Sequence, residues 1–252
     1  MESGLHISLK AERLFDLWGI PVTNTLLTEW IVMIVLAGVA FVVGRNPSLI
    51  PGKVQLVFEW IIDFVLDFMQ QTLGSRALAE RYFPLIATIF LFIFTSNLFD
   101  FLPIFSGIGI VQHGELVPLF RPVNSDLNVT LALAIIAVIT IEVAGIVGLG
   151  ALRYAGKFFN FSSPVNFVVG IIEFVSELSR FVSFSFRLFG NIFAGEVLLA
   201  VIGLFVPYVL PVPLMMFELF VGFVQAAVFA MLTLFFIKLA IAMPHGAEAH
   251  AH

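Results

Sequence analysis

The chain has 252 residues, of which 60% are hydrophobic and 12% are charged, and its mean hydropathy is +1.08. So few charged side chains cannot cover a compact water-exposed fold, and so many apolar ones exclude an intrinsically disordered chain, which together indicate a membrane protein. The formal net charge of −5 without a Lys/Arg-rich run argues against nucleic acid as a partner, and the absence of cysteine excludes disulfides, thiolate zinc sites and iron–sulfur clusters.

The first third of the chain contains one predicted span and one amphipathic helix. Residues 1–25 carry several charges and are expected to form an outer N-terminal segment, while residues 26–44 have the length of about 20 apolar residues that crosses a bilayer. In residues 53–79 apolar positions recur at steps of three and four, with acidic residues on another face. This pattern predicts a helix at the membrane interface. The alternative, a core helix of a soluble insertion, has no second segment to supply a soluble core.

Further spans are predicted at 83–105, 127–150, 166–206 and 212–243, followed by a tail at 244–252. The last two are too long for a perpendicular crossing, because a helix of about forty residues measures about 60 Å, twice the hydrocarbon thickness. They must therefore tilt, bend or leave the bilayer. These elements predict a single all-α polytopic membrane domain, with about five transmembrane helices and one interfacial helix.

The Lys and Arg residues of the loops set the expected orientation, because cytoplasmic loops carry an excess of them. With the N-terminus outside, six lie inside and three outside: Arg45, Lys53, Arg76, Arg81, Arg153 and Lys157 against Lys10, Arg13 and Arg121. We therefore expect the N-terminus outside and the C-terminus inside. Two basic residues, Arg180 and Arg187, remain within the fourth span.

Arg187 lies near the middle of that span, where a charge costs about 2.5–3.5 kcal/mol, so a functional role is the default interpretation. The alternative is a structural ion pair with Glu173 or Glu177. At about 100° per residue, one polar stripe runs along the helix and must face protein or water: Glu173, Ser176, Arg180, Ser183, Arg187, Asn191 and Ala194. Glu173 and Glu177 are expected to neutralise Arg180. We then expect the counter-charge of Arg187 to come from another chain.

Polar residues on the last two spans extend this pattern. Glu196 projects about 180° away from Arg187, so we expect it to face a second polar space. Glu218 and Gln225 are seven residues apart and share a face of the last span. Each of these residues has an alternative interpretation as a hydrogen-bonded clip between helices.

Three further acidic or amide residues give weaker signals. Asn97 and Asp100, near the end of the second span, either line a polar path or sit at the outer interface. Glu142, in the third span, suggests an ion path or a pairing whose partner the sequence does not identify.

The sequence predicts no cofactor and no metal site. All five histidines lie outside the predicted spans, which argues against haem, and the motifs of zinc and serine intramembrane hydrolases are missing. The His/Ala tail is expected to be a solvated end of the chain.

Residues 183–196 read SFSFRLFGNIFAGE, which closely resembles subunit a of F-type ATP synthases, the stator half of the membrane proton channel. Further resemblances follow in the expected order: GKVQLVFEW from Gly52, SNLFDFLP from Ser96, DLNVTLALA from Asp126 and VQAAVFAMLTLFF from Val224. Together they cover most of residues 52–236. Glu142 and the tail match no part of the family pattern.

The resemblance implies a tilted hairpin of the last two spans against a rotating ring of c subunits. Arg187 would be the essential, catalytic arginine facing the ring carboxylate. The aqueous paths would be lined by Asn191, Glu196, Glu218 and Gln225, with further lining from Ser183, Asn97, Asp100, Glu142, Glu173 and Glu177. Many relatives carry a histidine at one of the two positions Glu196 and Glu218.

The implied partners are the c-subunit ring, b-type peripheral stalk subunits, the remainder of the ATP synthase and the lipid bilayer. The resemblance implies no nucleotide site in this chain. The lack of an Arg/Ser-rich transit peptide favours a bacterial plasma (inner) membrane. A different class, a secondary transporter that binds an anionic substrate at Arg187, would be expected to show internal repeats, and the two halves of the chain have no self-similarity. A purely structural scaffold would not need a mid-span arginine.

Overall fold

The computed structural model describes residues 11–17, 19–45, 52–101, 108–112, 115–158, 163–206 and 209–242. Five helices in this part are long and apolar enough to cross a membrane: α1 (Asn24–Gly44), α3 (Arg76–Asp100), α5 (Leu127–Leu149), α7 (Pro164–Phe205) and α8 (Pro211–Ile241). This confirms the predicted all-α polytopic membrane fold.

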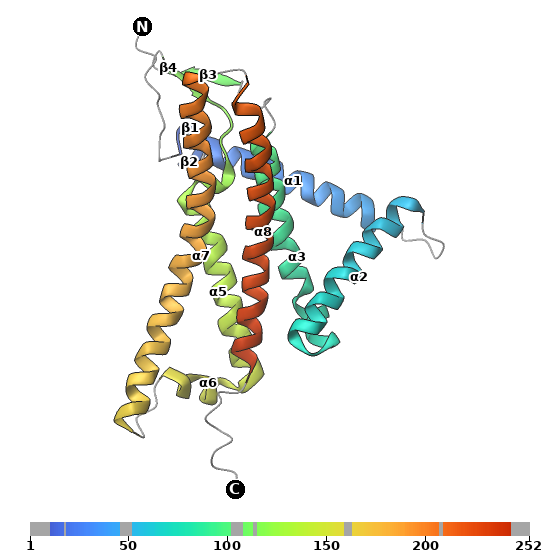
Figure 1. The fold of residues 1–252 in the computed structure, drawn as a ribbon, viewed down its shortest axis with the longest axis vertical. Coiled ribbons are helices and arrows are strands. Elements are labelled where there is room, and N and C mark those ends of the chain that lie inside the picture. Colours follow the sequence, from blue (N-terminus) through green and yellow to red (C-terminus); the bar gives the residue numbers. More distant parts are fainter. Residues whose placement is uncertain are drawn as a thin grey trace.

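Helices α3, α5, α7 and α8 run side by side in one bundle, and α1 projects away across the bundle axis (Figure 1). The short α6 (Ala151–Phe158) lies across one end of the bundle, and the small strands lie at the other. Following the orientation expected from the loop charges, we call the α6 end the inner end and the strand end the outer end. With its 21 residues α1 matches the thickness of a bilayer core, so a membrane normal along α1 would leave α7 and α8 strongly inclined.

Local sequence explains why α7 is one unbroken helix of 42 residues. Ser163 caps its start by accepting a hydrogen bond from the Val165 backbone N–H at 3.4 Å, and Pro164 occupies the first turn, where its missing N–H costs nothing. No proline follows until Pro207. At 1.5 Å per residue the helix is about 63 Å long, about twice the hydrocarbon thickness.

The amphipathic helix α2 (Lys53–Leu73) ends earlier than the predicted boundary at residue 79, and α3 begins at Arg76 rather than at residue 83. The cause is Gly74, which adopts a positive φ of 75° and donates its N–H to the Gln70 carbonyl, a common helix stop. Arg76 then fixes the corner through ion pairs to Asp67 at 2.9 Å and to Glu80 at 3.0 Å. At its other end α3 stops at Asp100, and residues 102–105 of the predicted span lie outside the described residues.

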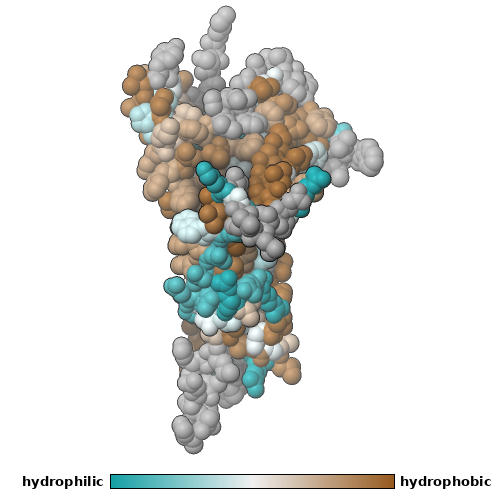
Figure 2. All heavy atoms as spheres, turned by 90° about the vertical axis from the view of Figure 1, so that its right-hand side faces the viewer, coloured by the Kyte–Doolittle hydropathy of each residue, from teal (hydrophilic) through white to brown (hydrophobic). Residues whose placement is uncertain are grey.

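Apolar side chains on α2 are exposed, among them Leu56, Trp60 and Phe64. Seen from the side on which α1 and α2 project, hydrophobic residues cover much of the upper part, and hydrophilic ones gather in a patch below (Figure 2). An exposed apolar face beside a charged one is what an interfacial helix presents to lipid headgroups. The interfacial position of α2 stays a prediction.

Two small antiparallel hairpins at the outer end were not predicted. Strand β1 (Arg13–Leu17) pairs with β2 (Ile20–Thr23), and β3 (Gly109–Gln112) pairs with β4 (Glu115–Pro118). A 3-10 turn, η1 (Val123–Ser125), follows them. The start of α1 holds this region together, because Asn24 Nδ2 donates to the Pro118 carbonyl at 3.4 Å and Thr28 Oγ1 accepts from the Arg121 backbone N–H at 3.3 Å.

The bundle core combines aromatic and small side chains. Phe184 of α7 and Phe229 of α8 are 3% and 1% exposed, and their ring centroids lie 4.8 Å apart in an edge-to-face pair. Buried alanines such as Ala137 and Ala226 let the helix backbones approach closely, which is how helices associate where lipid removes most of the hydrophobic driving force.

The contact between α3 and α8 depends on Gly222, because a Cβ there would lie 2.9 Å from Asn97 Cβ. Asn97 cannot move away without losing the hydrogen bond that its Nδ2 donates to the Gly222 carbonyl at 2.9 Å. We therefore expect Gly222→Ala to destabilise the bundle by about 1–3 kcal/mol through overpacking. The measurement is the temperature at which the detergent-solubilised complex loses this chain.

Gly203→Ala on α7 is the matched control, since a Cβ at Gly203 would have nothing within 4 Å. This variant should be neutral or slightly stabilising, because alanine favours a helix over glycine by about 1 kcal/mol. Equal loss temperatures for the two variants would contradict the packing argument.

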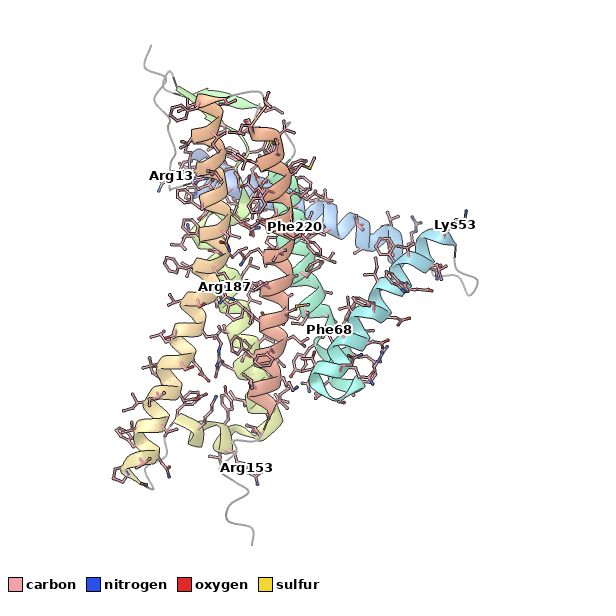
Figure 3. All side chains as sticks on the ribbon, in the orientation of Figure 1. Arg13, Lys53, Phe68, Arg153, Arg187 and Phe220 are labelled. Atoms are coloured by element: carbon pink, nitrogen blue, oxygen red, sulfur yellow. The ribbon has the colours of Figure 1, made fainter. Side chains whose placement is uncertain are left out.

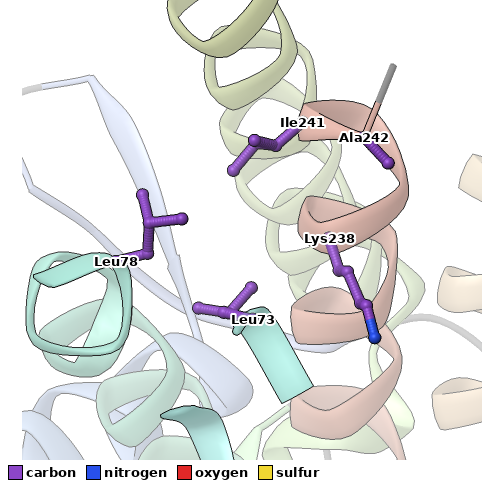
Figure 4. Close-up of a pocket in the computed structure, with 5 residues that line it drawn as sticks. All are labelled: Leu73, Leu78, Lys238, Ile241 and Ala242. Carbon is purple, nitrogen blue, oxygen red and sulfur yellow. The ribbon is translucent and has the colours of Figure 1, made fainter. Parts of the chain in front are cut away.

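A shallow hollow of about 170 Å³ lies between the α2–α3 corner and the inner end of α8 (Figure 4), lined by Leu73, Leu78, Lys238, Ile241 and Ala242. Its one charged lining residue is Lys238. It therefore lacks the carboxyl or imidazole groups that exchange protons near neutral pH. Such groups lie instead between the long helices.

Candidate functional site

Arg187 lies near the middle of α7 (Figure 3). Its neighbours Phe184 and Leu188 pack into the bundle core, whereas Arg187 itself is exposed. The guanidinium Nη2 donates to Ser183 Oγ, one helical turn away, at 3.0 Å. Among the described residues no acidic group forms an ion pair with Arg187. The structure thus presents an unneutralised cation on the outside of the chain, halfway along its longest apolar helix.

Asn191 and Gln225 continue the polar face of α7 toward α8. Asn191 Nδ2 donates to Gln225 Oε1 at 2.7 Å, which joins the two helices one turn from Arg187. Gln225 is 5% exposed, and its Nε2 is buried without a hydrogen-bond partner among the described residues. Buried amide groups in native proteins are nearly always satisfied by protein or water, so this position calls for water.

An outer cluster of three carboxylates, Asp100 of α3, Glu196 of α7 and Glu218 of α8, lies toward the strand end. Asp100 accepts a hydrogen bond from the Val123 backbone N–H, and its carboxylate is within electrostatic range of both glutamates. The Glu218 carboxylate packs directly against Gly195, where any Cβ would displace it. The outer cluster is therefore built by the consecutive helices α7 and α8 together with α3, which is distant from them in sequence.

Amide groups extend the outer cluster into the bundle. Asn97 is buried and accepts from Asn124 Nδ2 of η1 at 2.7 Å, in addition to its bond to Gly222. Four buried polar atoms in this region have no hydrogen-bond partner among the described residues: Ser96 Oγ, Asp100 Oδ2, Asn124 Oδ1 and Glu196 Oε2. Because each such atom costs about 1–3 kcal/mol if left unsatisfied, these four atoms are expected to bind water or polar groups of another chain.

An inner cluster at the α6 end contains Glu142 of α5, Tyr154 and Lys157 of α6, and Glu173 and Glu177 of α7. Lys157 Nζ forms an ion pair with Glu173 and a second one with Glu177 at 3.2 Å. The Tyr154 hydroxyl donates to Glu142 Oε2 at 2.8 Å, which identifies the partner that the sequence left open. Burial, together with this hydrogen bond, raises the pKa of Tyr154, so the phenol remains the proton donor.

The expectation that Glu173 and Glu177 neutralise Arg180 was wrong. Both carboxylates pair with Lys157, whereas the Arg180 guanidinium carbon lies 4.0 Å from the centroid of the Phe236 ring, a cation–π contact with α8. The reason is the chain reversal after α5, which brings α6 back against α7. The same pairing removes the alternative of an ion pair between Arg187 and either glutamate.

The comparison with known proteins agrees with this arrangement. The family described as ATP synthase A chain matches residues 26–238, a range that includes Arg187 and both clusters. The ATP synthase subunit a of Moorella thermoacetica is 34% identical over 224 residues, which are 89% of this chain and 93% of that protein. The chain belongs to the ATP synthase A chain family.

Family membership establishes the general role. The chain is an integral, multi-pass component of the membrane sector of an F-type ATP synthase, and it takes part in proton transport as a member of that larger complex. This result displaces the alternative of a secondary transporter with an anion at Arg187.

Sequence reasoning missed several residues of the two clusters. Lys157 was counted among the loop charges but assigned to no site, and Tyr154 and Asn124 were not proposed as site residues. Asn124 precedes Asp126, whose carboxylate caps α5 by accepting from the Asn128 backbone N–H at 2.9 Å, so the available signal indicated a helix start rather than a site. The glycines at 195 and 222 carry no sequence signal for the side chains that pack on them.

Proposed function

We propose that the chain is the stator of the proton channel, with two half-channels that meet a rotating ring of c subunits at Arg187. The observation that carries this proposal is the exposed guanidinium of Arg187, which has no acidic partner among the described residues and lies on α7 between the outer and inner clusters. A cation in this position is tolerated in a membrane when a partner chain supplies the counter-charge.

The spacing along α7 supports two separate paths. Glu196 lies nine residues toward the outer end and Glu177 ten residues toward the inner end, so each is about 14–15 Å from Arg187 along the axis. The outer path would run past Asp100, Glu196 and Glu218 and reach Arg187 by way of Gln225 and Asn191. The inner path would run past Glu173 and Glu177, with Glu142 behind them and Ser183 beside Arg187.

The proposed mechanism uses the permanent charge of arginine. A protonated ring carboxyl carried through lipid meets Arg187, whose positive charge favours the ionised carboxylate, and the proton leaves into one half-channel. The fixed positive charge of the guanidinium repels protons that would pass directly from one path to the other. Each proton that crosses gains about 2.3 kcal/mol per 100 mV, so several are required for each ATP.

The remaining parts of the proposal concern the surroundings. The last two helices would lie as a tilted hairpin against the ring, and b-type stalk subunits would hold the chain against rotation. ATP would be made and hydrolysed in other subunits, without a cofactor in this chain. The membrane would be a bacterial plasma membrane, with the N-terminus outside and the C-terminus in the cytoplasm.

Disulfide cross-linking to the ring tests the proposed contact. Because the chain has no native cysteine, any cross-link from this chain must come from the cysteine that was introduced. Leu198 is 45% exposed and, eleven residues after Arg187, points within about 20° of it. We expect Leu198→Cys to form disulfides with cysteines placed along the outer helix of a c subunit in the assembled complex.

Leu178→Cys is the matched control, because Leu178 is 57% exposed on the same helix and points about 180° away from Arg187. It should give no ring cross-link at any position of the scan. A ring cross-link from Leu178→Cys and none from Leu198→Cys would show that the ring does not face Arg187.

A further inference from the structure

The short helix α6 is fastened to both neighbouring helices. The Tyr154 ring lies over Gly145 of α5, where a Cβ would collide with it, and Tyr154 is 4% exposed. On the other side Lys157 pairs with Glu173 and Glu177, and the Phe158 carbonyl packs against Gly170 of α7. The helix α6 therefore packs against both α5 and α7 and holds their inner ends together.

Lys157 supplies the positive charge that directly pairs with the inner carboxylates. Its side chain is 24% exposed, and those of Glu173 and Glu177 are 33% and 13% exposed. Glu142 lies within electrostatic range of Glu177, so a third carboxylate adjoins the two that Lys157 pairs with. Such half-buried charges interact more strongly than surface pairs, because less water screens them. Removing Lys157 would leave the carboxylates with their mutual repulsion.

The groups that surround Lys157 come from every helix packed around it. They are Glu142 of α5, Tyr154 and Phe158 of α6, and Glu173, Glu177 and Arg180 of α7, with Phe236 of α8 beneath Arg180. Arg180 lies against that aromatic ring and forms no ion pair with a described carboxylate. Lys157 is thus the cation placed to tune the charge of the inner cluster.

We propose that Lys157 is a positioning residue for the inner proton path: its ammonium holds Glu173 and Glu177 ready to exchange protons with the inner solution, and the Tyr154–Glu142 hydrogen bond fixes α6 so that Lys157 stays in place. This inference rests on the proposed function. Apolar contacts would be enough if α6 only packed against its neighbours. Instead, Lys157 of α6 forms ion pairs with two partly exposed carboxylates on α7, the helix that carries Arg187.

The test is passive proton conductance of inverted vesicles from which the soluble ATPase head has been stripped, measured against pH on the α6 side. For Lys157→Met we expect the pH midpoint of conductance to move upward by about one unit or more, because the carboxylates lose the opposite charge beside them. Lys157→Arg should keep the wild-type midpoint. Arg153→Met is the matched control, since Arg153 is exposed on the same helix and forms no ion pair among the described residues.

A wild-type midpoint in Lys157→Met would overturn the inference. If the complex with Lys157→Met does not assemble, Glu142→Gln tests the same inference. It removes one of the three inner carboxylates, while the Lys157 ammonium stays in place. Its midpoint should move downward, and an unchanged midpoint overturns the inference. ATP-driven pumping, measured before the heads are stripped, distinguishes failure of the proposed function from failure of this inference. Pumping by Arg187→Ala would refute the proposed function. Loss of pumping in Arg187→Ala, together with a wild-type pH midpoint of conductance in Lys157→Met, would refute this inference alone.

Discussion

Arg187→Ala is expected to lower ATP-driven acidification of inverted vesicles at least about a hundredfold. The guanidinium stabilises a carboxylate at 4–6 Å by about 3 kcal/mol, and each 1.36 kcal/mol is a factor of ten in an equilibrium. Among the described residues no other basic side chain lies within two helical turns of Arg187 on its own face except Arg180, which is stacked on Phe236. No substitute cation is therefore in place. The measurement is the quenching of a pH-sensitive dye after ATP is added.

Two controls make this result interpretable. Arg153→Ala removes an exposed arginine from α6 and should leave pumping unchanged. ATP hydrolysis by the soluble head and the amount of the chain in purified complexes should both match wild type in Arg187→Ala. Undiminished pumping by an assembled Arg187→Ala complex would make the arginine structural, and an anion-transport assay would then be the next experiment.

Glu218→Gln is expected to lower pumping more than tenfold. The amide has the size of the carboxylate and keeps its hydrogen-bonding capacity, but it cannot take up and release a proton. Glu218 is the α8 member of the outer cluster, and its carboxylate is within electrostatic range of those of Asp100 and Glu196. The loss should appear in ATP-driven acidification and in the passive conductance of stripped vesicles, because protons would cross the proposed outer path in both measurements.

Gly195→Ala tests whether pumping depends on where the Glu218 carboxylate lies, because this variant moves the carboxylate without removing its charge. A methyl at 195 would meet the Glu218 carboxylate, which is the end of a flexible side chain and can swing away at little cost in stability. This variant should reproduce part of the pumping loss with all carboxylates still present. Glu80→Gln, at the exposed inner end of α3, is the charge-matched control. Equal pumping by Glu218→Gln and Glu80→Gln would remove Glu218 from the path.

Periodicity was sufficient to place Arg187, because a single helix determines which of its residues share a face. The stripe from Ser183 to Asn191 depends only on about 100° per residue, and the length of α7 follows from an apolar run without proline. The direction of Glu196, away from Arg187, follows from the same arithmetic. These features need no knowledge of what the neighbouring helices do.

Contacts between distant segments could not be obtained in this way. The pairing of Lys157 with Glu173 and Glu177 requires α6 to fold back on α7, and a search for partners along one helix chose Arg180 instead. The same limit applies to Asn97, whose partners Asn124 and Gly222 are 27 and 125 residues away. The early end of α2 at Gly74 was missed because apolar spacing continues across the glycine, and only its positive φ ends the helix.

The outer cluster draws its members from α3, η1, α7 and α8, and this distribution bears on biosynthesis. Asn97 and Asp100 lie on α3, and α8, which carries Glu218 and Gly222, is synthesised more than a hundred residues later. A nascent chain with only its first helices inserted holds polar groups without the helices that complete their surroundings. The proposed outer path needs all four elements, so it is complete only after α8 has been made, and a chain that lacks α8 is expected not to dissipate the gradient of the membrane that receives it.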